Sequence, residues 1–194
     1  VTGGLSISFT TTNSSGDYIL DGLPAGNYRV RTIATVTGLP YIDKWYNNKT
    51  SATTADTVSV AVSTDTPNIT FTLDLGGTIS GYVYQSDNTT PIEGAIINVF
   101  SYASLSGIRV SYGTARTAAD GSYRTSGVPT GQYGVQVTAS GYATQWYNNV
   151  LYWQQSTAVS VTTPDNTPNI NFSLGPGGSI TGRVYQADNV TPIA

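Results

Sequence analysis

The sequence contains no cysteine, no histidine and no methionine. Without cysteine it has no disulfides and no thiolate metal sites, so an extracellular domain of this sequence must be stabilised by packing alone. Without histidine it has no imidazole–carboxylate catalysis and no histidine-ligated zinc or copper, which removes most familiar hydrolase mechanisms. The missing initiator methionine before Val1 indicates a processed protein or a piece of a longer one.

Charge is scarce as well. Charged residues make up 10% of the 194 residues, the formal net charge is −3, and the only lysines are Lys44 and Lys49. No basic stripe is available to neutralise phosphates, which argues against nucleic-acid binding. No apolar run has the length of a membrane span or the pattern of a signal peptide. We therefore expect no nucleic acid and no membrane insertion among the partners of this segment, and no cofactor.

An internal repeat is the dominant feature. Trp-Tyr-Asn-Asn at 45–48 returns at 146–149, an offset of 101 residues, and the related runs at 77–81 and 178–182 keep that offset. We predict a partial β-sandwich repeat lacking its first two strands at 1–75, a complete repeat at 76–175, and the first strand of a further repeat at 176–194. Because so few residues separate adjacent repeats, they are expected to form a stiff rod.

The composition and the local patterns predict an all-β fold. Thr, Val, Ile and Tyr are abundant, and Ile170, Phe172 and Leu174 alternate with polar residues, as in a strand with one buried face. Short strands separated by turn signals indicate tandem Greek-key antiparallel β-sandwich domains of the prealbumin or Ig-like type. The strands are predicted near 77–85, 94–101, 108–116, 122–126, 132–139, 144–148, 156–162 and 168–174. The predicted core includes Ile79, Val83, Ile97, Val99, Tyr123, Val128, Tyr133, Val135, Val159, Val161, Ile170, Phe172 and Leu174.

Several motifs resemble those of the carboxypeptidase regulatory-like family. They are Gly-Gly-x-Ile-x-Gly-x-Val at 76–83, Pro-Ile-x-Gly-Ala at 91–95, Asp-Gly-x-Tyr at 120–123 and Leu-Pro-Ala-Gly-x-Tyr at 23–28. The run at 142–149 is similar to tandem bacterial surface copies of such domains. The resemblance implies a prealbumin-like β-sandwich that serves as an extracellular module without peptidase activity.

The related collagen-adhesin B-type stalk domains often carry a Lys–Asn isopeptide bond. The complete repeat has no lysine, and Glu93 is the only glutamate in the chain, so no such cross-link is expected in 76–175. Lys44 and Lys49 flank Trp45 in a predicted loop, whereas the lysine of such a cross-link lies at the start of a core strand.

The aspartates at 87, 120, 165 and 188 lie in turn contexts. Clustered loop carboxylates can bind calcium, but no Asp-x-Asp spacing occurs, and an aspartate in a turn is explained by hydrogen bonds to its own backbone. We favour turn chemistry and predict no metal site. Because these aspartates are spread along the sequence, no pair of carboxylates is indicated for glycoside hydrolysis.

Two further features could bind or carry glycans. An exposed Trp beside Asn side chains can stack on a sugar ring, although packing of these rings into the sandwich is the favoured interpretation. The candidate contacts are Trp45, Tyr46, Trp146, Tyr147 and Trp153. The candidate N-glycosylation sites are Asn13, Asn48, Asn68, Asn88, Asn171 and Asn189.

These observations favour a non-catalytic extracellular or cell-surface stalk or fibre. A glycan-binding or cell-surface-binding module and the accessory repeats of a larger secreted enzyme remain as alternatives. The expected partners are adjacent repeats or neighbouring copies of the chain. Surface glycans are added if the chain is a glycan-binding module. The incomplete terminal repeats have two explanations. Either the chain is a piece of a longer array of repeats, or the terminal strand of one copy inserts into another copy. In the second case Ile180 and Val184 belong to the donor strand, which packs against Tyr28, Val30 and Phe71 of the other copy.

Overall fold

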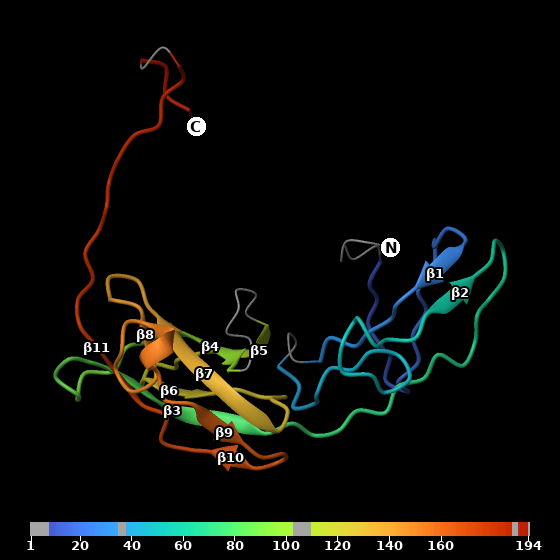
Figure 1. The fold of residues 1–194 in the computed structure, drawn as a ribbon, viewed down its shortest axis with the longest axis horizontal. Helices are drawn as coiled ribbons and strands as arrows, with labels where there is room; N and C mark the ends of the chain where they lie inside the picture. Colours follow the sequence, from blue (N-terminus) through green and yellow to red (C-terminus); the bar gives the residue numbers. More distant parts are fainter. Residues whose placement is uncertain (1–7, 35–37, 103–109, 188–189, 194) are drawn as a thin grey trace.

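The computed structural model describes residues 8–34, 38–102, 110–187 and 190–193. Two β-rich lobes follow each other along the chain, and a C-terminal extension leaves the second lobe (Figure 1). We call residues 8–74 the first lobe, 78–174 the complete module and 176–193 the extension. In the described part of the chain, no helix has the length and apolar character needed to cross a membrane.

The complete module is a sandwich of two sheets, as predicted. In one sheet, β3 (Thr78–Gln85) pairs with β6 (Ser122–Arg124) on one edge and with β10 (Asn166–Thr167) and β11 (Phe172–Leu174) on the other. In the other, the order is β5 (Ser111–Arg116), β4 (Ile96–Ser101), β7 (Gly131–Thr138) and β8 (Gln145–Trp146), with β9 (Val159–Val161) also beside β7. A single 3-10 turn, η2 (Trp153–Gln155), interrupts the β structure of the described residues.

The pairing of β3 differs from the expected, fully antiparallel arrangement. Both β10 and β11 run parallel to β3, with Phe172 opposite Val83 and Leu174 opposite Gln85. Alternation of apolar and polar residues reports which face of a strand is buried, and it carries no information on strand direction. The parallel pairing has a structural consequence: the chain starts the module at Thr78 and leaves it beside Gln85, at the opposite end of the same strand.

The core between the sheets follows the predicted faces. All thirteen predicted core residues belong to one buried cluster, and Val83, Ile97, Val99 and Leu174 are completely inaccessible. Ile92, Ala95 and Val137 join the cluster without having been predicted. Burial of this apolar surface is the main stabilising contribution to the fold.

The described residues of the first lobe form one short sheet, β1 (Gly26–Tyr28) paired with β2 (Val58–Val60). This pair corresponds to β7 with β9 in the complete module, where Gly131 lies opposite Val161. The aromatic packing is also repeated. The Tyr46 and Phe71 rings meet edge-on at 6.2 Å, as do the Tyr147 and Phe172 rings at 6.2 Å. The two lobes therefore build the same local structure from matching positions of the repeat.

Candidate interaction sites

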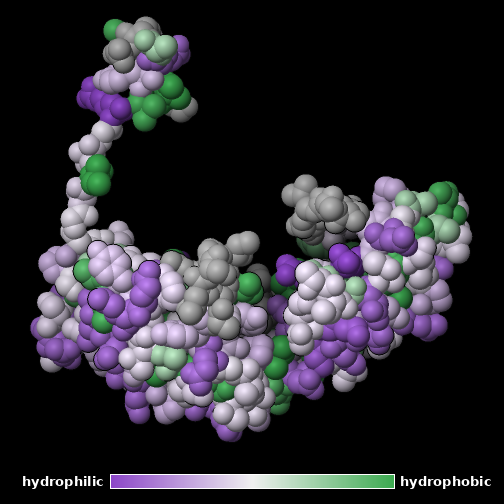
Figure 2. Space-filling model, viewed as in Figure 1, coloured by the Kyte–Doolittle hydropathy of each residue, from purple (hydrophilic) through white to green (hydrophobic). Residues whose placement is uncertain are grey.

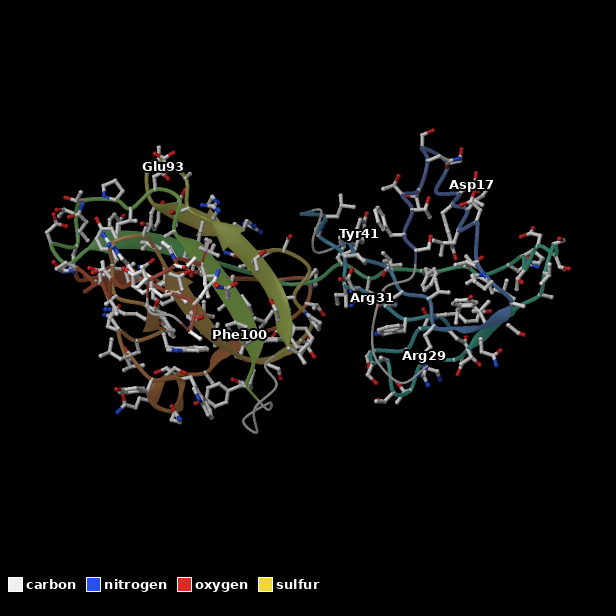
Figure 3. All side chains as sticks on the ribbon, turned by 90° about the horizontal axis from the view of Figure 1, so that it is seen from above. Asp17, Arg29, Arg31, Tyr41, Glu93 and Phe100 are labelled. Carbon is white, nitrogen blue, oxygen red and sulfur yellow. The ribbon has the colours of Figure 1, made fainter. Side chains whose placement is uncertain are left out.

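The segment between the lobes is held by both of them. On the first-lobe side, the Gly76 amide donates to the Pro40 carbonyl at 2.8 Å, next to a bridge between Tyr41 and Leu75. On the other side, Gly77 and Val128 exchange two backbone hydrogen bonds of 2.8 and 3.1 Å. Figure 3 shows Tyr41 on the part of the first lobe that faces the complete module.

The close approach at Gly76 requires glycine. A Cβ at this position would lie 2.4 Å from the backbone carbonyl carbon of Gly127, far inside van der Waals contact. The linking residues therefore pack backbone against backbone, and a side chain at Gly76 would push the lobes apart.

The second junction repeats the first. The Gly177 amide donates to the Gly141 carbonyl at 2.9 Å, beside a bridge between Tyr142 and Pro176, and a Cβ on Gly177 would lie 2.9 Å from the backbone of Tyr142. Gly177 is the repeat equivalent of Gly76, offset by 101 residues. Sequence analysis predicted a short linker but not this docking, although the glycine shared by both junctions was an available signal.

The Trp-Tyr-Asn-Asn motif has a packing role in the complete module. Trp146 is only 5% exposed and its ring lies 5.7 Å from that of Phe100, so it is not accessible to a sugar. The neighbouring Tyr147 ring packs on Phe172. Asn148 and Asn149 follow with positive φ values of 75° and 57°, a conformation that asparagine tolerates better than most residues.

The other candidate rings are more open. Trp45 is half-buried, and the Arg31 guanidinium lies 5.6 Å from its ring centre, a cation–π contact. Tyr46 is also half-buried. Trp153 is half-exposed in η2, next to Tyr152, which is 66% exposed. Of the predicted aromatic contacts in the complete module, Trp153 is therefore the one beside a well-exposed aromatic residue.

A shallow groove lies on the outside of the module where β3 meets β11. The Asn171 side-chain oxygen accepts from the Tyr82 amide at 2.9 Å, and that of Asn149 accepts from the Ser173 amide at 3.3 Å. Within the described part of the chain, neither side-chain nitrogen has a hydrogen-bond partner. The groove is lined by Tyr84, Asn88, Asn149, Asn171, Phe172 and Ser173.

All the candidate glycosylation sites that the structure describes lie on the surface. Asn13, Asn48, Asn68, Asn88 and Asn171 are all exposed. Asn189 lies outside the described residues. Asn88 and Asn171 are near each other, because both line the groove.

The aspartates make turns. The Asp87 carboxylate accepts from the Thr89 and Thr90 amides at 2.9 and 2.8 Å, and the hydrogen bonds from Thr90 and Thr89 lower the pKa of Asp87 to about 2. Hydrogen bonds from Ser122 likewise lower the pKa of Asp120. The described residues hold no group of three or more His, Cys, Asp or Glu side chains that could share a metal ion. Asp188 lies outside these residues.

Lys44 is engaged by an acidic partner. Its ammonium lies 2.8 Å from the Asp74 carboxylate and donates to the Thr72 carbonyl, also at 2.8 Å. This arrangement ties the loop before Trp45 to the end of the first lobe.

The predicted donor-strand residues lie on the extension, away from the sheets of both lobes. Ile180 and Val184 are 103% and 69% exposed, and Figure 2 shows hydrophobic side chains on the extension, which stands clear of the module. Their predicted acceptors Tyr28, Val30 and Phe71 are half-buried in the first lobe.

Comparison with known proteins identifies one family. The carboxypeptidase regulatory-like domain matches residues 78–175. No curated protein matches the chain.

Three solved structures illustrate what the chain is similar to. A chain of the type II cohesin–X-dockerin complex of Acetivibrio cellulolyticus is 24% identical, with a TM-score of 0.35 over 53% of this chain and 59% of that one. The minor pilin of Streptococcus agalactiae is 17% identical, with a TM-score of 0.36 over 89% and 69% of the two chains. The major pilin subunit of Bacillus cereus is 13% identical, with a TM-score of 0.34 over 79% and 40%. Superpositions this weak support no functional inference.

Proposed function

Because the chain belongs to the carboxypeptidase regulatory-like domain family, we propose that it is a non-catalytic structural segment of an extracellular or cell-surface protein. Its β-sandwich modules follow one another in a stiff stalk or fibre, and its partners are adjacent repeats and other copies of itself. In this function the chain acts as a stiff spacer, and its copies associate end to end by β-strand addition.

The doubly held junction is the observation that carries the proposal. Gly76 is hydrogen-bonded to the first lobe and Gly77 to the complete module, so no free residue remains between them to act as a hinge. A flexible tether needs several residues without such bonds. The bond from Gly76 to the preceding lobe recurs at Gly177, which supports a repeating connection.

The direction of the strands supports the same conclusion. Since β3 and β11 are parallel, the complete module receives the chain at one end and releases it at the other. An antiparallel first and last strand would bring the two ends together and fold the array back on itself.

The stiffness can be measured with two spin labels, and the absence of native cysteine makes labelling clean. Exposed Ala61 and Gln154 are replaced by cysteine, and the distance distribution between the labels is recorded by pulsed electron paramagnetic resonance. We expect a narrow distribution, which Gly76→Ala broadens because its Cβ cannot be accommodated against Gly127. Gly178→Ala is the matched control, since a Cβ there meets nothing within 4 Å. A broad distribution in the unsubstituted chain, as wide as that of a flexible tether, would refute the stalk.

A second candidate function, glycan contact, is favoured by the groove beside β3. The Tyr82 and Tyr84 rings stack at 5.8 Å with a 10° interplanar angle, and Tyr82 is 43% exposed. Asn149 and Asn171 add amide nitrogens that can bind sugar hydroxyls. The first repeat has Thr70 where the complete repeat has Asn171, so this site would be specific to one copy.

Nuclear magnetic resonance titration with neutral mono- and oligosaccharides tests this candidate. Binding would shift the resonances of Tyr84, Asn149 and Asn171, and Asn171→Thr, which installs the residue of the other repeat, would abolish the shifts. Trp153→Ala separates the groove from the exposed aromatic turn. If no sugar shifts either region, the glycan function is wrong.

A further inference from the structure

The last strands of the complete module run beside its first strand in the same direction. β10 pairs with the start of β3, where Asn166 lies opposite Thr78, and β11 pairs with its end, where Leu174 lies opposite Gln85. The chain enters the module at the start of β3 and leaves it after β11, and Figure 1 shows these two points on opposite sides of the module. Tension along the chain therefore pulls neighbouring strands in opposite directions along their common axis.

This geometry loads the hydrogen bonds between the strands in shear. When two paired strands are pulled past each other, all the bonds between them share the force and have to break together. When the strands are pulled apart from one end, the bonds break one pair at a time. Because each hydrogen bond is weak by itself, the direction of the force decides how well the row of bonds resists it.

Further hydrogen bonds fill the gap between β10 and β11. The Ile170 amide donates to the Ser80 carbonyl at 3.1 Å, and the Tyr82 amide donates to the side-chain oxygen of Asn171 at 2.9 Å. The side-chain nitrogen of Asn166 donates to the Ser80 hydroxyl at 2.9 Å. We call residues 165–174 the returning segment. Its bonds to β3 extend from one end of that strand to the other.

β3 is held on both of its edges and from the core. On the edge away from the returning segment it pairs with β6, so it cannot swing aside under load. The core side chains on either side of the row are buried: Val83 and Leu174 are fully inaccessible and Phe172 is 2% exposed. Hydrogen bonds beside such a dry core are electrostatically stronger than bonds in water.

Two common covalent cross-links between strands are excluded by composition. The chain has no cysteine for a disulfide, and the complete repeat at 76–175 has no lysine for an isopeptide bond. Any resistance to pulling between the first and last strands of this module therefore comes from hydrogen bonds and packing. That makes the direction of the strands decisive.

We propose that the complete module bears tension, and that the pairing of β3 with the returning segment is the element that holds under load. The inference rests on the proposed structural function, in which force passes along the chain, and adds load-bearing to spacing. Load enters through Gly77, which exchanges two backbone hydrogen bonds with Val128, and leaves through Gly175, whose carbonyl accepts from the Ala143 amide at 3.0 Å. Resistance is high along the chain and low across the strand pair.

Pulling single molecules of the full chain in optical tweezers, from two directions, tests the proposal. Handles on Leu75→Cys and Gly178→Cys load the strands in shear, whereas handles on Ser86→Cys and Gly178→Cys separate them from one end; all three positions are exposed. The rupture force should be at least about twofold higher in shear, because several hydrogen bonds share the load. Each shear event should release roughly 300 Å of chain, the extended length of residues 78–174 less the folded span. Equal rupture forces in the two directions would overturn the proposal.

Asn171→Ala tests whether the side-chain bond to Tyr82 belongs to the load-bearing row. It should lower the rupture force in shear and leave the force for separation unchanged, because separation starts at Leu174 and meets the bonds of β11 first. Gln132→Ala is the matched control, since it removes an exposed 3.1 Å bond to Ser160 in the other sheet and should change neither force. A loss of the same size in both directions would be general destabilisation and would remove Asn171 from the row.

The two proposals fail separately. The spin-label distances between Ala61→Cys and Gln154→Cys report on the junction between the lobes, whereas the rupture forces report on the complete module alone. A narrow distance distribution with equal rupture forces in both directions would refute load-bearing and leave the stalk. A broad distribution with a direction-dependent rupture force would refute the stiff stalk and leave the load-bearing module.

Discussion

The Tyr123 hydroxyl donates a 2.6 Å hydrogen bond to the Ile170 carbonyl oxygen, passing the backbone of Gly81 on the way from β6 to the residues before β11. Tyr18 and Ile69 make the same bond in the first lobe, where no strand formed by the described residues crosses it. The bond therefore does not depend on the crossing strand. In the complete module the bonded carbonyl lies directly against Gly81 of β3. Burial raises the pKa of both tyrosines.

Removing the Tyr123 hydroxyl should destabilise the complete module. Tyr123→Phe leaves the Ile170 carbonyl without this donor in a buried place, so the free energy of unfolding should fall by about 1–2 kcal/mol. Tyr18→Phe is the matched variant, and its loss should be smaller because water can reach the half-buried Tyr18. Urea denaturation followed by tryptophan fluorescence measures both. Equal losses would contradict the difference in burial between the lobes.

The Phe172 ring should contribute more stability than its repeat equivalent. Phe172→Ala should lower the free energy of unfolding by about 3–5 kcal/mol through lost burial and a cavity. Phe71→Ala should cost less, since Phe71 is already half-exposed and the surrounding core is open. The comparison is made by denaturant unfolding of the two variants. A loss below about 0.5 kcal/mol for Phe172→Ala, the range of an ordinary surface substitution, would show that the face assignment is reversed.

Alkaline pH should unfold the complete module through its tyrosines. Burial, with a smaller effect of Tyr112, raises the pKa of Tyr133 to about 12 from its ordinary value of 10.0. The folded state thus holds Tyr133 neutral while the unfolded state ionises, so this stabilisation is complete below pH 10 and is lost as the pH rises toward 12. The denaturation midpoint, measured from pH 8 to 12, should fall over that window, and Tyr133→Phe should reduce the fall. A pH-independent midpoint would contradict the burial of this phenol.

The three tryptophans should differ in chemical accessibility. Trp146 should resist acrylamide quenching because it is 5% exposed, whereas Trp45 and Trp153 should be quenched more readily. Single-tryptophan chains, made by replacing the other two with phenylalanine, allow each to be measured separately. Efficient quenching of Trp146 in the folded chain would show that its ring is accessible, and Trp146 would again be a candidate glycan contact.

Comparison of the repeats within the sequence was sufficient to find the buried faces. Ile170 and Phe172 keep apolar partners in Ile69 and Phe71, whereas Asn171 is replaced by Thr70. Inward positions tolerate little change because they fill the core, and outward positions change freely. The same reasoning favoured packing for the Trp-Tyr-Asn-Asn motif, and Trp146 is indeed buried.

The residues that the sequence did not single out act through neighbours that are distant along the chain. Gly76 faces Gly127, and Asn149 shares the groove with Asn88, and no local pattern reports such pairs. The parallel direction of β11 also escaped prediction, since a strand's hydrophobic period is the same in either direction.

The sequence by itself determined that this protein is a β repeat, which side chains fill its core, and that it lacks the groups for imidazole or thiolate chemistry. These properties are local or are carried by self-similarity at a constant offset. Only the tertiary structure decided that β3 and β11 run parallel and that Gly76 locks the junction between the lobes. These relationships depend on which backbones lie side by side, and backbone hydrogen bonds are the same for every residue type, so side-chain identity does not encode them directly.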